Sequence, residues 1–102
     1  MTPLEIELES QMLAMIDGIL AAPVRFHDFA ERSYRFVVDI PAFPDRFEFF
    51  GDAQEKLDDV SWAREEEADI TPHDRELGAI TRAEYLAWLR ERRDVYRREF
   101  GR

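Results

Sequence analysis

Two imidazole side chains, His27 and His73, are the most obvious candidates for acid–base chemistry in this chain. A histidine activates a nucleophile when a serine and a supporting acid stand in the right pattern, or when a glycine-built turn presents the nucleophile. Neither histidine has such a pattern around it. We interpret His27 as a residue on the exposed edge of a helix. We interpret His73 as a surface residue in the first turn of another helix. The sequence therefore predicts a protein that is not an enzyme.

Residues 78–84 have the spacing of the second half of a calcium loop, with a glycine, an isoleucine two residues later and a glutamate six residues later. The first half would have to supply Asp or Asn, but its positions hold His73, Arg75 and Leu77. Glu-x-x-His, the motif of dinuclear carboxylate sites, does not occur, and there is no cysteine. We therefore expect no metal and no cofactor, and interpret Glu84 as a helix-capping residue.

Acidic residues dominate the composition, with 23 Asp and Glu against 14 Lys and Arg and a formal net charge of −9. Such a chain repels phosphate backbones, so direct nucleic-acid binding is disfavoured. No stretch approaches the roughly 18 apolar residues of a membrane span. The N-terminal segment is acidic and amphipathic, unlike a secretory signal. Together these features predict a cytoplasmic protein.

The negative charge is concentrated in residues 45–76, which carry a net charge of −8, whereas residues 77–102 carry +3. Acids there recur at three- and four-residue spacing, which places them on one outer face of a helix although like charges at this spacing destabilise it. Such a face is either solvated without a partner or a surface for a basic protein. The predicted partner-binding residues are Asp45, Glu48, Phe49, Asp52, Glu55, Asp58, Asp59, Trp62, Glu65 and Glu66.

Two aromatic residues in that set, Phe49 and Trp62, are predicted as apolar anchors beside the acids, because aromatic side chains concentrate binding energy at interfaces. The alternative is that they cap the edge of the core. Phe47, Phe49 and Phe50 point in different directions on an ideal helix, which favours at least one exposed ring.

Hydrophobic periodicity predicts four helices to position these residues. They run from about Leu4 to Ala22, from about Val24 to Val38, from Pro44 or Asp45 to about Val60 or Ser61, and from a capping box at Thr81–Glu84 to about Phe100. Between them we expect an extended connector at 40–44, a charged loop at 63–69 and a short capped turn from Thr71 to Gly78. Helices joined by short loops usually pack antiparallel. We predict an all-α fold: a small antiparallel four-helix bundle with one extra short helical turn, forming a single domain over residues 1–102.

The inner faces of these helices define the expected core. Leu8 and Met12 begin the stripe of the first helix, and the second contributes either Tyr34 or Ser33. The last helix is expected to turn Arg92 at least partly inward. The other expected inner residues are Met15, Ile16, Ile19, Leu20, Phe26, Phe29, Ala30, Val37, Phe47, Phe50, Ala53, Gln54, Leu57, Tyr85, Trp88, Leu89, Val95, Tyr96 and Phe100.

The pattern of helices resembles the colicin D-type immunity proteins, small helical inhibitors of tRNA-cutting bacterial toxins. The segments that carry the resemblance are Met15–Leu20, Phe26–Tyr34, the acidic third helix with Phe50 and Leu57, and Ile80–Tyr85. The adjacent tyrosine pair of the DNase-colicin immunity proteins is missing. The resemblance implies a protein that neutralises a basic toxin, an RNase or tRNase domain, by occupying its substrate cleft. The alternative is a non-catalytic interaction subunit or adaptor of a larger cytoplasmic complex.

Overall fold

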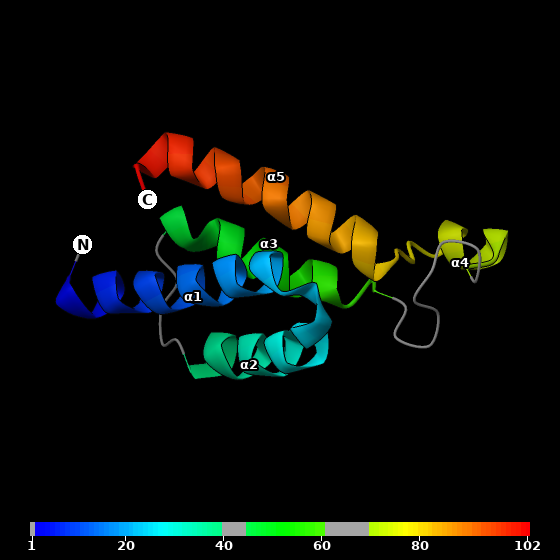
Figure 1. Ribbon diagram of the computed structural model, residues 1–102, viewed down its shortest axis with the longest axis horizontal. Helices are drawn as coiled ribbons and strands as arrows, with labels where there is room; N and C mark the ends of the chain where they lie inside the picture. The colour runs from blue at the N-terminus through cyan, green and yellow to red at the C-terminus, as the bar shows by residue number, and fades with distance from the viewer. Residues whose placement is uncertain (1, 40–44, 61–69) are drawn as a thin grey trace. The chain divides into compact units, whose positions relative to one another are not determined.

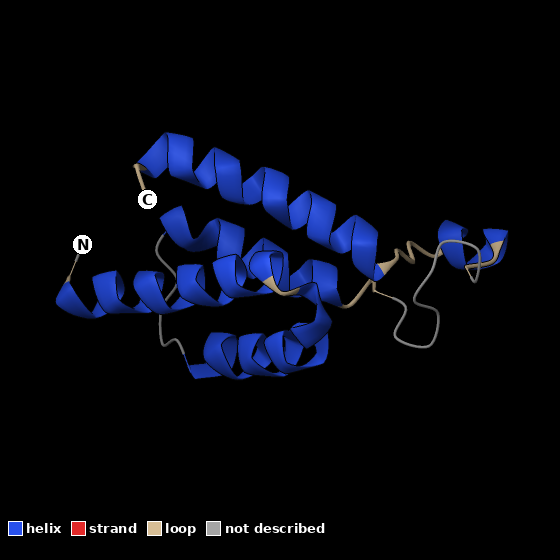
Figure 2. Ribbon diagram, in the orientation of Figure 1, coloured by secondary structure: helices blue, strands red, loops and turns tan. Residues whose placement is uncertain are grey.

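The computed structural model describes residues 2–39, 45–60 and 70–102 of the chain. All regular elements in these residues are helical (Figure 1, Figure 2), and an isolated parallel bridge pairs Val60 with Ile80. The chain groups into two compact units, Met1–Gln54 and Glu55–Arg102. The predicted all-α class is confirmed. The four-helix bundle and the single domain over 1–102 stay predictions.

The first unit opens with a helical hairpin. Helix α1 spans Pro3–Ala21 and is capped by Thr2, whose hydroxyl accepts a hydrogen bond from the backbone N–H of Glu5. It ends before Pro23, as predicted, because a residue that precedes proline is driven out of the helical region. A 3₁₀ turn, η1 (Pro23–Arg25), then leads into α2 (Phe26–Asp39), which runs back alongside α1 (Figure 1).

The predicted third helix is divided into two pieces. A 3₁₀ turn, η2 (Asp45–Phe47), precedes α3 (Glu48–Leu57), which begins in the first unit and continues into the second. The helix ends before the expected Val60, which instead pairs in the bridge, where the Ile80 N–H donates to the Asp59 carbonyl at 2.9 Å. The connector expected at 40–44 and the loop expected at 63–69 lie outside the described residues.

The second unit contains two helices that begin with capping boxes, as predicted. Helix α4 spans Pro72–Glu76 and α5 spans Arg82–Phe100, and their caps are Thr71 and Thr81. Gly78 follows α4 with a φ of +91°, a left-handed conformation that glycine adopts without a Cβ clash. Gly101 ends α5 in the same region, and its N–H donates to the carbonyl of Arg97 at 2.8 Å.

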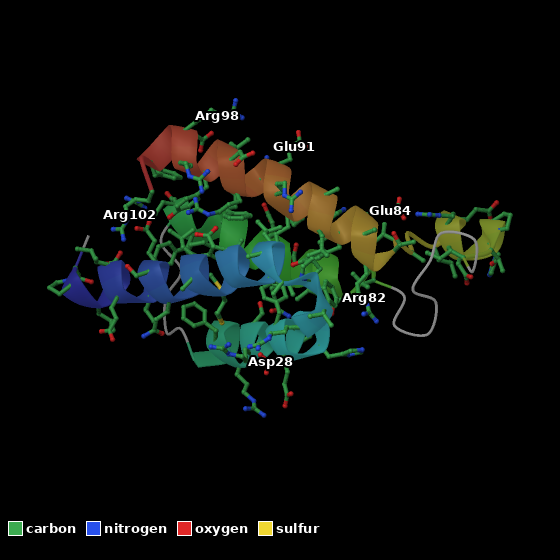
Figure 3. All side chains as sticks on the ribbon, in the orientation of Figure 1. Asp28, Arg82, Glu84, Glu91, Arg98 and Arg102 are labelled. Carbon is green, nitrogen blue, oxygen red and sulfur yellow. The ribbon has the colours of Figure 1, made fainter. Side chains whose placement is uncertain are left out.

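Glu84 links the two helices of this unit at the start of α5 (Figure 3). Its carboxylate accepts hydrogen bonds from the Thr81 backbone N–H at 3.0 Å and from Arg75 Nη1 at 2.7 Å. These bonds, the Thr81 backbone N–H first, hold the pKa of Glu84 below its ordinary value. The prediction that Glu84 is a capping residue is confirmed.

Thr81→Ala is expected to lower the free energy of unfolding by about 1–2 kcal/mol, because a helix cap that loses its side-chain acceptor costs that much. The Thr81 hydroxyl accepts from the Glu84 N–H at 3.1 Å, and Thr81 is 2% exposed. Urea denaturation measures the loss. Thr2→Ala is the matched control, because Thr2 makes the same capping box on an equally long helix but is exposed. We expect a smaller loss there; an unchanged midpoint for Thr81→Ala would contradict the prediction.

The observed core corrects the predicted faces of α1, α2 and α5. On α1, Met12, Ile16 and Ile19 are buried as predicted, but Glu9 and Leu13 are buried as well and Leu8 is only half-buried. On α2, Ser33 rather than Tyr34 is buried, and its hydroxyl donates to Gln54 Oε1 at 3.0 Å. On α5 the inward arginine is Arg93, whose Nη2 donates to the carbonyl of Arg102 at 2.7 Å, whereas Arg92 is exposed. Phe100, also expected to face inward, is exposed at the last turn of the helix.

Candidate protein-binding surface

Acidic side chains recur along η2 and α3 with alternating steps of three and four residues. We call Asp45, Glu48, Asp52, Glu55 and Asp59 the acidic row. Four of the five are exposed and Asp52 is half-buried. The neighbouring Asp58 is exposed as well. The structure therefore places the predicted acids of residues 45–59 where solvent or a partner can reach them.

The opposite side of α3 is apolar, which explains why the acids face outward. Phe50, Ala53 and Leu57 are fully buried at three- and four-residue spacing, and Phe47 in η2 is buried with them. A helix with one apolar face turns the remaining positions to solvent. Glu48, Asp52 and Glu55 occupy those remaining positions.

The two basic residues within 45–59 are Arg46 and Lys56, and both are engaged away from the acidic row. Arg46 Nη2 lies 2.6 Å from Oε2 of Glu9, which is 0% exposed. Lys56 Nζ lies 5.3 Å from the centre of the Trp88 ring, within the range of a cation–π contact. Neither of these local cations forms an ion pair with an acid of the row.

In the parts of the chain that the structure describes, no carboxylate of the acidic row forms an ion pair or a side-chain hydrogen bond. Three acids of other helices differ in this respect, since Asp28, Glu31 and Glu84 each pair with an arginine. Among the described residues, the acidic row thus presents negative charge without an ion-pair partner. A complementary positive surface would be attracted to it and would encounter it faster than a neutral surface would.

One predicted anchor needs correction. Phe49 is only 5% exposed, and its ring centre lies 5.6 Å from that of Phe50. Phe49 lies four residues before Ala53 and eight before Leu57 on α3, so helical spacing places its ring beside that buried face. All three are buried, and Phe49 belongs to the core edge rather than to the exposed surface. Trp62, Glu65 and Glu66 lie outside the described residues.

The histidines do not form a catalytic arrangement. His27 and His73 are both exposed, and His73 Nδ1 lies 3.9 Å from the carboxylate of Glu76 within the same short helix. Across residues 2–39, 45–60 and 70–102, no group of three His, Asp or Glu side chains could hold a metal ion. Nor does any helix in those residues combine the length and the apolar character needed to cross a membrane.

Sequence reasoning missed the buried ion pair between Glu9 and Arg46. The available signal was weak: Glu9 stands three and four residues before Met12 and Leu13, which are both buried. That spacing places Glu9 on the inner face, but a glutamate is normally assigned to solvent unless a partner is known. Arg46 is 37 positions later in the chain, so no local pattern joins the two.

Comparison with known proteins identifies no relative of this chain, so the interpretation of the acidic row depends on its geometry alone. No family model, no curated protein and no solved structure matches this chain. What supports a function is therefore the placement of charge: an acidic row outside, an apolar face inside, and both local cations turned elsewhere.

Proposed function

We propose that this protein is a non-catalytic, cytoplasmic inhibitor that binds a basic bacterial toxin, an RNase or tRNase domain, and blocks its substrate cleft. The observation that supports the proposal is the exposed acidic row, whose acids form no ion pair with Arg46 or Lys56, the two basic residues beside it. A nuclease cleft that attracts a phosphate backbone attracts a row of exposed carboxylates for the same reason. The helix pattern that resembles the colicin D-type immunity proteins points the same way.

The inhibition requires no chemistry from this chain. Carboxylates on successive turns of α3 are separated by a rise of about 5–6 Å, so they form a line of single negative charges. Such a line placed in a basic cleft excludes RNA by occupying the positions of its phosphates. Salt screens charges over about 8–10 Å at physiological ionic strength, so the complex should weaken as salt is added.

The test begins with capture of the partner. The tagged protein is used to retain polypeptides from an extract of the organism of origin at low and high salt. The retained basic polypeptide is then purified and assayed for cleavage of tRNA. Equimolar addition of this protein is expected to stop the cleavage. The triple variant Glu48→Lys, Asp52→Lys, Glu55→Lys is expected to weaken binding at least about 100-fold, since like charges then face each other.

A second triple variant controls for net charge. Glu7→Lys, Glu91→Lys, Glu99→Lys also changes the formal charge from −9 to −3, but the three positions are exposed on α1 and α5. Under the proposal this variant retains inhibition. Equal losses in both variants would show that only overall charge matters. If the charge-reversed α3 variant bound as tightly as the unmodified protein, the adaptor alternative would be favoured instead.

A further inference from the structure

A groove of about 510 Å³ lies between α1 and α2 in the first unit. This volume is within the range of small-molecule binding sites. Its wall is mainly apolar, with Met15 and Ile19 from α1 and Phe29 and Phe36 from α2. Met15 and Phe36 remain half-exposed, so part of the apolar wall faces the groove rather than the packed interior.

Small residues of α1 and its C-cap line the groove. Ala14, Gly18 and Ala22 follow one another at four-residue spacing, and all three line it. A Cβ added at Gly18 would meet no atom within 4 Å, and Gly18 has no positive φ. Neither packing nor backbone conformation therefore requires glycine at this position. Because glycine is less stable than alanine in a helix interior, the open space is kept at the expense of helix stability.

The charged residues of the groove carry an excess of positive charge. Arg25, Arg32 and Asp28 all line it. Arg32 and Asp28 are mostly exposed and are 3.6 Å apart, and Arg25 forms no ion pair with any residue that the structure describes. Asp28 is labelled on α2 in Figure 3. A guanidinium group presents a planar fork of donors that matches a carboxylate.

We propose that this groove binds a small amphipathic carboxylate. The apolar chain of the ligand lies against the apolar wall, and its carboxylate accepts hydrogen bonds from Arg25, with Arg32 adding a second positive charge. The positive charge of the groove favours a ligand that carries a negative charge. The protein as a whole is strongly negative, so a preference for an anion must come from these local arginines. The inference does not rest on the acidic row, because the lining residues belong to α1, η1 and α2.

Three probes test the proposal by calorimetry and by NMR titration of the full chain. Decanoate carries the chain and the negative charge, decyltrimethylammonium carries the chain with a positive charge, and acetate carries the charge without the chain. Decanoate is expected to saturate at one molecule per protein and to bind at least about tenfold more tightly than decyltrimethylammonium. Acetate is expected to show no saturable binding. Decanoate should shift the amide signals of residues that line the groove, such as Gly18 and Ala22.

Variants separate the two parts of the site. Gly18→Leu fills the groove and Arg25→Gln removes the cation, and each is expected to weaken decanoate binding at least about tenfold. Gly18→Ala adds one methyl group to the same position and should retain most of the affinity while raising the melting temperature. Arg35→Gln is the matched charge control, because Arg35 is an exposed arginine of α2 that does not line the groove.

The proposal is overturned by any of three results. Decanoate fails to saturate, the cationic probe binds as tightly as decanoate, or Arg25→Gln weakens binding no more than Arg35→Gln does. If Gly18→Leu does not fold, the comparison of Arg25→Gln with Arg35→Gln and the three probes still test the proposal. None of these results bears on the acidic row, which the toxin-inhibition assay tests separately.

Discussion

Replacing Arg46 with alanine is expected to lower the free energy of unfolding by about 3–5 kcal/mol, the usual cost of removing one partner of a buried ion pair. Glu9 on α1 is 0% exposed, and Arg46 Nη2 is 2.6 Å from its carboxylate. Removing the guanidinium leaves that buried negative charge without its nearest cation. The arginine stem also packs partly against the protein, because the Arg46 side chain is only 25% exposed.

An exposed pair of similar geometry provides the control for this variant. Arg35 and Glu31 are 2.7 Å apart on α2, but their side chains are 73% and 65% exposed. Ion pairs of this kind contribute roughly 0–1 kcal/mol, so Arg35→Ala should change stability by less than about 1 kcal/mol. Both variants are measured by urea denaturation under the same conditions. A loss of less than about 1 kcal/mol in Arg46→Ala would mean that burial of Glu9 does not depend on this partner.

The double variant Glu9→Leu, Arg46→Met tests whether the pair itself stabilises the fold. Replacing a buried ion pair by apolar residues of similar volume is often neutral or stabilising. We therefore expect the double variant to recover most of the stability that Arg46→Ala loses. A double variant as unstable as the single one would show that the arginine fulfils a role beyond compensation of Glu9.

Phe50→Ala is expected to lower the free energy of unfolding by about 3–5 kcal/mol, because it removes a large buried side chain and leaves a cavity. Phe50 is 0% exposed, and its ring centre is 5.0 Å from that of Phe47 and 5.6 Å from that of Phe49. Pairs of aromatic rings at such distances add stability beyond the area they bury. Urea denaturation of the purified variant measures the loss.

Glu48→Ala is the matched control on the other side of the same helix. Its side chain is exposed, so the substitution should change stability by no more than about 0.5 kcal/mol. Under the proposed function the same variant weakens binding of the basic partner. Similar stability losses for Phe50→Ala and Glu48→Ala would contradict the division of α3 into a buried apolar face and an exposed acidic face.

The sequence by itself determined where α4 and α5 begin. Thr2, Thr71 and Thr81 each accept a hydrogen bond from a residue three positions later, and each opens a helix. The capping boxes at Thr71 and Thr81 were predicted because all of their atoms lie within four consecutive residues. The same locality made the outward placement of Glu48 and Glu55 predictable, since helical spacing relates neighbours on one element.

The tertiary structure decided which polar and aromatic side chains became buried. Glu9 is tolerated inside because Arg46 reaches it from a distant segment. Phe49, predicted as an exposed anchor, is buried because it lies at four-residue spacing before Ala53 and Leu57 on the packed side of α3. The groove of α1 and α2 exists only where two helices lie side by side, with Gly18 leaving space between them. For Glu9 and for the groove, the free energy depends on contacts between residues far apart in the chain, and periodicity along one element carries no information about such contacts.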